Sequence, residues 1–445
     1  MPASPSPVPH RVVIVGGGAG GLPLAARLGD RYRRSGRVAV TLVDQCSTHV
    51  WKPLLHEVAA GRMDAAAHDL DYLALAHWHH FRFQQGAFGR IDRARHEVTL
   101  ERVIDEDGEE ILPVRVLPYD TLVLCLGSVS NDFGVTGVAE HAIWLDTARD
   151  AERFHRKLIA ACVRVDAQRA AGDDAAKVRL VIIGAGATGV ELAAELRQTT
   201  EAHAAYGLDH LAPRDIRITI VEAAARVLPP LPQSIATAAL ELLSRLDISV
   251  RTGQRVTGVE PAGVRVATGE LLPADLVVWA AGIQAPDLGE RLDGLEQGRG
   301  HQIVVNETLA TTRDPDIFAF GDCADCPWPH AGKPDARVPP RAQAARQQGQ
   351  MLVKTIEARL AGRPLPVFRF RDYGSLVSLG ELSAVGNLMG SLIGGNMLIQ
   401  GLIARWMYES LYKLHQVSLL GVFRVTLDTI GRFLRGRATP RVKLH

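Results

Sequence analysis

The sequence predicts an α/β fold with two copies of one parallel-sheet domain, because a strand, a glycine-rich turn and a helix follow one another twice. In each copy a short apolar run leads into a glycine cluster, at 16–21 in the first and at 184–189 in the second, and a helical stretch follows. The next apolar run ends at an acidic residue, Asp44 in the first copy and Glu222 in the second. This order is typical of Rossmann-type dinucleotide-binding domains.

The other elements follow from apolar runs and turn residues along the chain. The predicted strands are 12–15, 38–43, 121–126, 178–183, 216–221, 276–281 and 317–322. Short strand-like segments around these runs predict antiparallel β insertions. From about residue 365 the chain alternates like paired strands, and 402–435 reads as helix. We expect a first domain split into 1–146 and 286–364, a second at 147–285, and a C-terminal region at 365–445.

Composition excludes several classes of protein. Fifty basic against 49 acidic residues give a net charge of +1, which offers no overall field for nucleic acid. Five cysteines in 445 residues make no disulfide framework, and the first ten residues do not form a signal peptide. Residues 382–404 carry no charge but hold five glycines, which predicts buried strand and loop rather than a spanning helix.

The glycines of each loop have separate physical tasks. Gly16 and Gly184 allow the sharp turn from strand to helix. Gly18 and Gly186 let the backbone approach a pyrophosphate, and Gly21 and Gly189 let helix and strand pack closely. The remaining predicted cofactor-binding residues of the loops and strand ends are Ala19, Gly20, Ala187, Gly127 and Gly282.

The acidic residues indicate which nucleotide each copy binds. Asp44 and Glu222 are placed to accept hydrogen bonds from ribose hydroxyls, and the alternative of two structural turns with incidental acids is disfavoured by the duplication. FAD fits the first copy, because Asp322 follows a late strand and supplies a second contact from far downstream. NADH fits the second copy, since Glu222 repels a 2′-phosphate, although Arg226 four residues on softens that preference.

The residues resemble the type II NADH dehydrogenase family, the non-proton-pumping NADH:quinone oxidoreductases, especially its bacterial members. The resemblance runs from about residue 10 to the end of the chain. The glycine loops are shared with all two-dinucleotide-domain flavoproteins, whereas three other motifs are more discriminating. These are WKPLLHEVAAG at 51–61, AQAARQQ at 342–348 and RATPRVKLH at 437–445.

The resemblance implies roles for further residues. The stretch 51–61, with Lys52 and Pro53, would lie along the flavin ring. Thr188 and Glu191 would line the nicotinamide side, with Glu191 handling a proton or positioning the substrate. Gln343 and Gln347 would border the quinone pocket. These glutamines share one helix face, and without their context a solvated face would be the better interpretation. The implied activity passes hydride from NADH to FAD and two electrons to a membrane quinone without pumping protons.

The C-terminal region indicates a membrane partner. Residues 401–445 hold eight basic and two acidic residues, a net charge of +6, and combine them with an amphipathic helical pattern. Apolar area together with basic residues favours binding in an anionic lipid interface, and we expect a peripheral protein on the cytoplasmic face of the inner membrane. A docking helix on the core or in a homodimer is the alternative.

Other patterns carry less chemistry. Cys323 and Cys326 have redox spacing but fit a bystander pair, and the histidines at 77–80 fit a solvated cluster rather than a metal site. Three competing functions remain open. They are a sulfide:quinone oxidoreductase, for which Cys125 and Cys162 show no suitable pairing, a soluble NADH-dependent reductase, and a non-enzymatic flavin-binding signalling protein.

Overall fold

The chain forms two compact units in a computed structural model. The structure describes residues 8–64, 69–204, 208–329, 335–378, 384–388, 397–400 and 402–435. Unit 1 comprises Met1–Val50, Asp69–Val129 and Gln284–Asp372, and unit 2 comprises Trp51–His68, Ser130–Ile283 and Tyr373–His445. These compact units do not test the boundaries of the nucleotide-binding domains expected from the sequence, so those boundaries stay a prediction.

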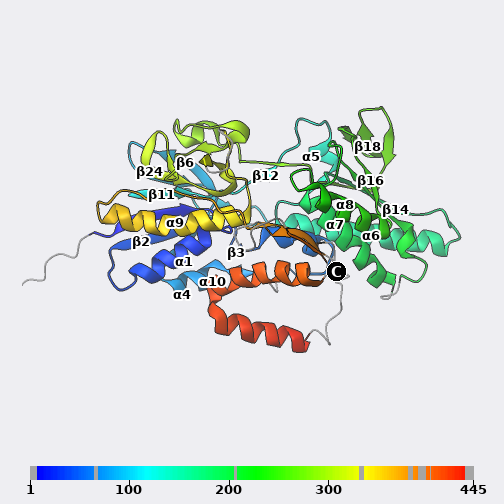
Figure 1. Ribbon diagram of the computed structural model, residues 1–445, viewed down its shortest axis with the longest axis horizontal. Helices are drawn as coiled ribbons and strands as arrows, with labels where there is room; N and C mark the ends of the chain where they lie inside the picture. The colour runs from blue at the N-terminus through cyan, green and yellow to red at the C-terminus, as the bar shows by residue number, and fades with distance from the viewer. Residues whose placement is uncertain are drawn as a thin grey trace, which may run out of the picture. The chain divides into compact units, whose positions relative to one another are not determined.

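Unit 1 is built around a six-stranded sheet in the order β23-β24-β11-β1-β2-β5 (Figure 1). These strands span Ala310–Thr311 (β23), Asp314–Ala319 (β24), Thr121–Leu124 (β11), His10–Val15 (β1), Val38–Asp44 (β2) and Arg82–Gln85 (β5). The five strands from β24 to β5 are parallel, and β23 joins them antiparallel. Helix α1 (Gly21–Tyr32) packs against α4 (Tyr72–His79) and α9 (Ala342–Leu360). A small antiparallel sheet, β10-β7-β6 (Arg115–Pro118, Glu97–Leu100 and Phe88–Asp92), forms an insertion.

Unit 2 repeats this design with a five-stranded parallel sheet in the order β13-β20-β14-β15-β16. The strands span Ile143–Trp144 (β13), Leu276–Trp279 (β20), Val178–Ile183 (β14), Ile216–Val221 (β15) and Ser249–Arg251 (β16). Its helices are α6 (Ala148–Ala170), α7 (Ala187–Ala204) and α8 (Gln233–Arg245), and its antiparallel insertion is β17-β18-β19 (Val256–Glu260, Gly263–Val266 and Leu271–Pro273). The order β20-β14-β15-β16 matches β11-β1-β2-β5 of unit 1, which confirms the predicted fold of two Rossmann-type copies with antiparallel insertions.

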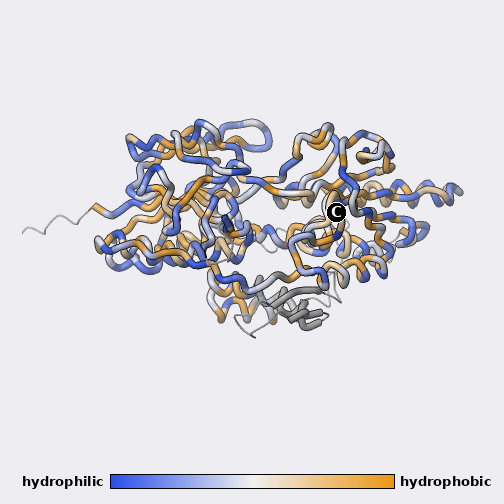
Figure 2. Tube along the Cα trace, turned by 45° about the horizontal axis from the view of Figure 1, so that its top comes forward, coloured by the Kyte–Doolittle hydropathy of each residue, from blue (hydrophilic) through white to orange (hydrophobic). Residues whose placement is uncertain are grey.

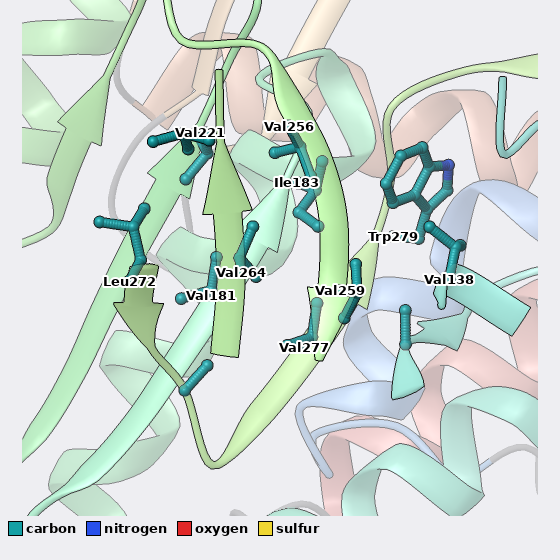
Figure 3. Close-up of a cluster of buried hydrophobic side chains, with 13 residues drawn as sticks. Val138, Val181, Ile183, Val221, Val256, Val259, Val264, Leu272, Val277 and Trp279 are labelled. Carbon is teal, nitrogen blue, oxygen red and sulfur yellow. The ribbon is translucent and has the colours of Figure 1, made fainter. Parts of the chain in front are cut away.

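Buried aliphatic side chains hold the sheet and the insertion of unit 2 together. A cluster of thirteen buried residues joins β14 and β20 to the antiparallel strands, with Val138 and Trp279 at one end and Leu272 at the other (Figure 3). The central strands are largely apolar, whereas the helices alternate apolar and polar residues along their length (Figure 2). Each sheet is therefore buried on both faces, as a parallel sheet covered by helices requires.

The C-terminal part of unit 2 consists of three antiparallel strands and a helix. The strands are β26 (Gly374–Ser378), β27 (Ala384–Leu388) and β28 (Met397–Gln400), and α10 (Leu402–Arg435) follows them. The predicted helix at 402–435 is confirmed, with a break at Gly421, where φ is +77° and ψ is 159°. Within the described ranges, no helix combines the length and apolar character needed to cross a bilayer. The tail motif at 437–445 and parts of the uncharged segment 382–404 lie outside the described residues.

The two glycine loops leave no room for a side chain at the positions where the sequence predicts close packing. Gly184 has φ +106°, a conformation that side-chain-bearing residues rarely adopt. A Cβ atom on Gly189 would overlap the carbonyl oxygen of Gly184, whereas a Cβ atom on Gly186 would meet nothing within 4 Å. Close packing of helix on turn therefore constrains Gly189, and it does not constrain Gly186.

These two glycines allow a matched test of folding. We expect Gly189→Ala to lower the free energy of unfolding by about 2 kcal/mol or more, because backbone atoms must move to accommodate the methyl group. Gly186→Ala should leave the unfolding temperature of unit 2 close to that of the wild type. Thermal unfolding followed by circular dichroism measures both, and equal loss in the two variants would contradict the packing argument.

Candidate active site

The first glycine loop lies at the carboxyl ends of the parallel strands of unit 1. It turns from β1 into α1, and Gly16 has φ +112°. A Cβ atom on Gly21 would overlap the carbonyl oxygen of Gly16, and one on Gly20 would meet the Phe320 ring and the Ala345 carbonyl of α9. Around Gly18 there is open space to at least 4 Å, and this residue is exposed. The loop is therefore closed toward the protein and open at Gly18, which with the half-buried Ala19 comes just before the start of α1.

Asp44 ties the end of β2 to this loop. Its Oδ2 accepts a hydrogen bond of 2.6 Å from the Gly17 amide, and its Oδ1 accepts one of 2.9 Å from the Cys46 amide. Burial raises the pKa of Asp44, while these amide hydrogen bonds lower it. The buried Tyr72 hydroxyl donates to the Gly17 carbonyl at 2.9 Å. The acid thus shapes the loop directly through its hydrogen bonds.

A second group of predicted residues meets at the ends of β11 and β24 in the same unit. Asp322 follows β24, and its Oδ2 accepts a hydrogen bond of 2.8 Å from the Ser128 hydroxyl. Ser128 follows Gly127, which has φ +70° and open space around its Cα. Because β11 and β24 are paired neighbours, Gly127 and Asp322 share one sheet edge with the Gly16 turn. The predicted downstream acid therefore lies on the same edge as the first loop.

The glutamines of α9 bind neighbouring backbone. Gln347 forms two hydrogen bonds with Arg371, donating from Nε2 to its carbonyl at 2.9 Å and accepting from its amide at 3.1 Å. Gln343 Nε2 donates to Asp372 Oδ1 at 3.2 Å. The buried Gln348 accepts from the Gly321 amide at 2.9 Å, next to Asp322. The sequence does not single out Gln348, which directly follows Gln347 but is buried in the core.

Unit 2 repeats the loop and its acidic anchor. Glu222 Oε2 accepts a hydrogen bond of 2.7 Å from the Ala185 amide, and Oε1 accepts one of 2.7 Å from the Ala224 amide. Ala185 occupies the same place in the second loop as Gly17 in the first. At the start of α7, Ala187 and Thr188 are exposed and Gly186 is open. The amides at this helix start are therefore accessible to an anion.

Gly282 lies beyond β20 in unit 2. Its carbonyl accepts a hydrogen bond of 3.0 Å from the Asn131 amide, and a Cβ atom on it would press against the Phe133 ring. The Trp279 indole donates to the Asn131 carbonyl at 2.7 Å. Gly282 thus lies where two segments of unit 2 approach closely, which accounts for glycine at this position.

The stretch that begins at Trp51 folds into a short 3-10 turn, η1 (Lys52–Leu54), and helix α2 (Leu55–Ala59). Lys52 and Pro53 are exposed, whereas the following residues are buried. Helix α2 packs against α6 and α7 of unit 2. Contacts with α6 and α7 therefore hold the helical part of this stretch in place, while Lys52 and Pro53 at its start remain exposed.

Glu191 is a buried carboxyl group on α7. It is 7 % exposed, its Oε1 accepts a hydrogen bond of 3.0 Å from the Ser378 amide, and its Oε2 lies 3.8 Å from Nδ1 of His56. Burial raises the pKa of Glu191 to about 8, with a smaller opposing effect of the Ser378 amide. A carboxyl group with this pKa exchanges its proton near neutral pH, which suits acid–base work.

The cysteines and the histidine cluster carry no comparable arrangement. Cys323 and Cys326 are buried free thiols, and burial raises the pKa of each to about 12, which disfavours the reactive thiolate. The His79 ring hydrogen-bonds Asp30 at 2.8 Å, and His77 and His80 are exposed. Among the described residues, no group of three or more potential ligands could hold a metal ion.

The two loops fit the groups that the sequence predicts for them. In unit 1, there is open space at Gly18 just before the start of α1, and Asp44, Gly127 and Asp322 lie at the same sheet edge. This set suits the pyrophosphate and ribose of FAD. In unit 2, Gly186 and Glu222 suit the same parts of NADH. The residues of each unit are therefore compatible with a dinucleotide.

Comparisons with known proteins agree with this arrangement. Residues 10–349 match the family model of the pyridine nucleotide-disulphide oxidoreductases. A type II NADH:quinone oxidoreductase from Haemophilus influenzae is 41% identical over 449 residues, covering 98% of this chain and 99% of the relative. The type II NADH:quinone oxidoreductase NdhA of Mycobacterium tuberculosis is 28% identical and covers 93% of this chain and 84% of its own.

Solved structures share the fold. The NDH2 structure from Plasmodium falciparum in complex with NADH superposes with a TM-score of 0.79 at 18% identity, covering 98% of this chain and all of that one. The sulfide:quinone oxidoreductase from Aquifex aeolicus gives 0.70 at 18% identity, with 93% and 92% coverage. The similar TM-scores do not distinguish NADH oxidation from sulfide oxidation, so the family is decided by the near-full-length sequence identity. The resemblance found in the sequence is confirmed: this chain belongs to the pyridine nucleotide-disulphide oxidoreductases and, among them, to the type II NADH:quinone oxidoreductases.

Proposed function

We infer that this chain is an NADH:quinone oxidoreductase that oxidises NADH and reduces a membrane quinone. The observation that carries this inference is the duplicated loop, closed toward the protein at its last glycine and open at its middle glycine, in a chain 41% identical to a type II enzyme. FAD, when bound, carries the two electrons from one substrate to the other. The chain itself binds, orients and shields these groups.

We assign FAD to unit 1 and NADH to unit 2. The assignment to unit 1 is supported by Asp322, which adds a late carboxylate to the edge that holds the Gly16 turn. The assignment to unit 2 is supported by Glu222, whose bonds to two amides fix a negative charge beside the loop. A fixed carboxylate repels a 2′-phosphate, so NADH is preferred to NADPH.

Gln343 and Gln347 border the quinone site in this proposal, and Glu191 serves the nicotinamide side. Support for the glutamines comes from α9, which places both amides on one face with Asp372 and the Arg371 backbone. Gln347, with both amide atoms bonded to Arg371, holds the wall of the site. Gln343, whose Nε2 bonds the Asp372 carboxylate at 3.2 Å, is the candidate to turn toward a quinone oxygen.

Anaerobic stopped-flow spectroscopy tests this function and the role of Gln343. NADH should bleach the flavin absorbance of the wild type, and added quinone should restore it. Gln343→Ala should leave bleaching by NADH unchanged and slow the return by about tenfold, the effect of losing roughly 1.4 kcal/mol from one polar contact.

Lys354→Ala is the matched control, because Lys354 is an exposed residue of the same helix. It should change neither phase. If Gln343→Ala slows bleaching as much as recovery, the quinone assignment of α9 is wrong. If sulfide rather than NADH bleaches the wild type, the proposed donor is wrong.

Donor choice depends on Glu222. The double change Glu222→Gln with Ala223→Arg removes the carboxylate and adds a cation at an exposed neighbour, so kcat/KM for NADPH relative to NADH should rise at least tenfold. Ala225→Arg, at another exposed position of this turn, adds the same charge and keeps the carboxylate. It should leave the ratio nearly unchanged, and an equal rise in both variants would show that charge alone, without Glu222, sets the preference.

We further propose that α10 attaches the protein to the cytoplasmic face of the inner membrane. Before Gly421 this helix is docked in unit 2, where the buried His415 ring lies 4.1 Å from the Trp51 ring, centre to centre. Among the side chains described beyond Gly421, four apolar ones are more than half exposed. They are Val422 (68%), Phe423 (75%), Leu427 (53%) and Ile430 (51%). Exposed Arg424 and the basic C-terminal sequence supply the charge that favours anionic lipid.

Liposome flotation tests the membrane proposal. Phe423→Glu with Leu427→Glu should lower the bound fraction on anionic vesicles by tenfold or more, since each side chain contributes about 1.5–3 kcal/mol when buried in lipid. The control, Val163→Glu with Leu240→Glu, adds the same charge at exposed apolar positions of α6 and α8. Unchanged flotation with loss of a dimer in sedimentation would instead assign this face to a second copy of the chain.

A further inference from the structure

Two buried carboxyl groups on α7 face the Trp51 stretch one helical turn apart, and their partners differ. Glu195, 2% exposed, accepts a hydrogen bond of 2.7 Å from the Arg62 guanidinium. Glu191, 7% exposed, instead faces the His56 ring at 3.8 Å. A guanidinium is always charged, whereas an imidazole need not be. The two carboxyl groups are therefore given different electrostatic partners by one short segment of chain.

The hydrogen bonds of His56 fix which ring nitrogen carries the hydrogen. The ring bonds the Pro53 carbonyl, and Nε2 is buried with no hydrogen-bond partner among the described residues. A carbonyl oxygen only accepts, so Nδ1 carries the hydrogen and Nε2 presents a lone pair. Burial lowers the pKa of His56 to about 4, so the ring is neutral at neutral pH. The nitrogen nearest Glu191 is thus a neutral N–H group.

Burial and two neighbouring carboxylates favour the protonated form of Glu191, and a backbone amide opposes them. Burial is the main cause of the raised pKa, and the negative charges of Glu57 and Glu195 raise it further. The Ser378 amide on β26 lowers it. The positive charge of Arg62 is paired with the Glu195 carboxylate, to which the guanidinium donates a hydrogen bond. The Ser378 amide is hydrogen-bonded to Glu191, and the Nδ1–H of His56, which bonds the Pro53 carbonyl, lies 3.8 Å from the other carboxyl oxygen.

We propose that His56 is a positioning residue for the proton of Glu191. Its Nδ1–H stabilises the carboxylate that forms when the proton leaves, and its open Nε2 accepts a proton while that carboxylate is charged. A carboxylate paired with imidazolium is better tolerated in the interior than an isolated carboxylate. The inference deepens the proposed function, because oxidation of NADH by a quinone takes up one proton from water per turnover.

Infrared titration of the FAD-loaded protein without NADH or quinone tests this proposal. The carbonyl stretch of the protonated carboxyl, identified by its absence in Glu191→Gln, should disappear in the wild type near pH 8. His56→Phe should move the midpoint up by about one unit, because the N–H group is lost. His56→Gln keeps an N–H donor on a more flexible side chain, so its midpoint should fall between the two.

His141→Gln is the matched control, since His141 is an exposed histidine of unit 2. It should leave the midpoint unchanged. His56→Leu removes the same N–H group with a smaller side chain and serves if phenylalanine prevents folding. An unchanged midpoint in the His56 variants, or no protonated carboxyl band at neutral pH, would overturn the proposal.

The kinetic readout separates this inference from the proposed function. Turnover with NADH and quinone should fall as the pH rises through the midpoint of Glu191, and in His56→Phe the fall should begin about one unit higher. A shifted infrared midpoint in a protein that NADH does not reduce would leave the His56 inference standing and reject the activity. Normal turnover with an unshifted midpoint would support the activity and reject the His56 inference.

Discussion

The steric constraint at the start of α1 and α7 governs the rest of the structure. At each place the helix begins so close to the preceding turn that a methyl group on Gly21 or Gly189 would strike the backbone. This closeness directs the first amides of the helix toward the sheet edge and leaves the middle glycine open. An acid at the end of the next strand then fixes the turn through a second amide. A tight turn, an open helix start and an anchored carboxylate are thus consequences of one packing arrangement, used twice.

Much of this arrangement can be predicted from the sequence because its signals are local. The strands at 178–183 and 216–221, the two loops and the helix at 402–435 depend on apolar periodicity and on glycine spacing, which neighbouring residues reveal. The positions of the acids Asp44 and Glu222 at strand ends are predicted in the same way. The sequence does not predict their hydrogen bonds to Gly17 and Ala185, since the expected partner is a ribose and the loop amides compete for the same oxygens.

Other residues of the site could not be predicted because their meaning depends on distant partners. Tyr72 holds a carbonyl 55 positions before it, and Ser378 donates to a carboxyl 187 positions before it. His56 is one buried histidine among several until the fold brings it to Glu191. No periodicity links such pairs. Gln348 shows the same limit at short range, because only the packing of α9 distinguishes it from Gln343 and Gln347.

Gly421 has a consequence for how this protein can vary. Its backbone conformation, rarely open to residues with a side chain, separates a helical segment anchored by His415 and Leu419 from one whose apolar residues mostly face outward. Beyond Gly421 the described side chains of the helix are mostly exposed, with Val425 as a buried exception. Substitutions at the exposed positions there alter what the surface binds without repacking the nucleotide-binding sheets, so adaptation to a different lipid composition and preservation of the redox centre are largely independent evolutionary problems.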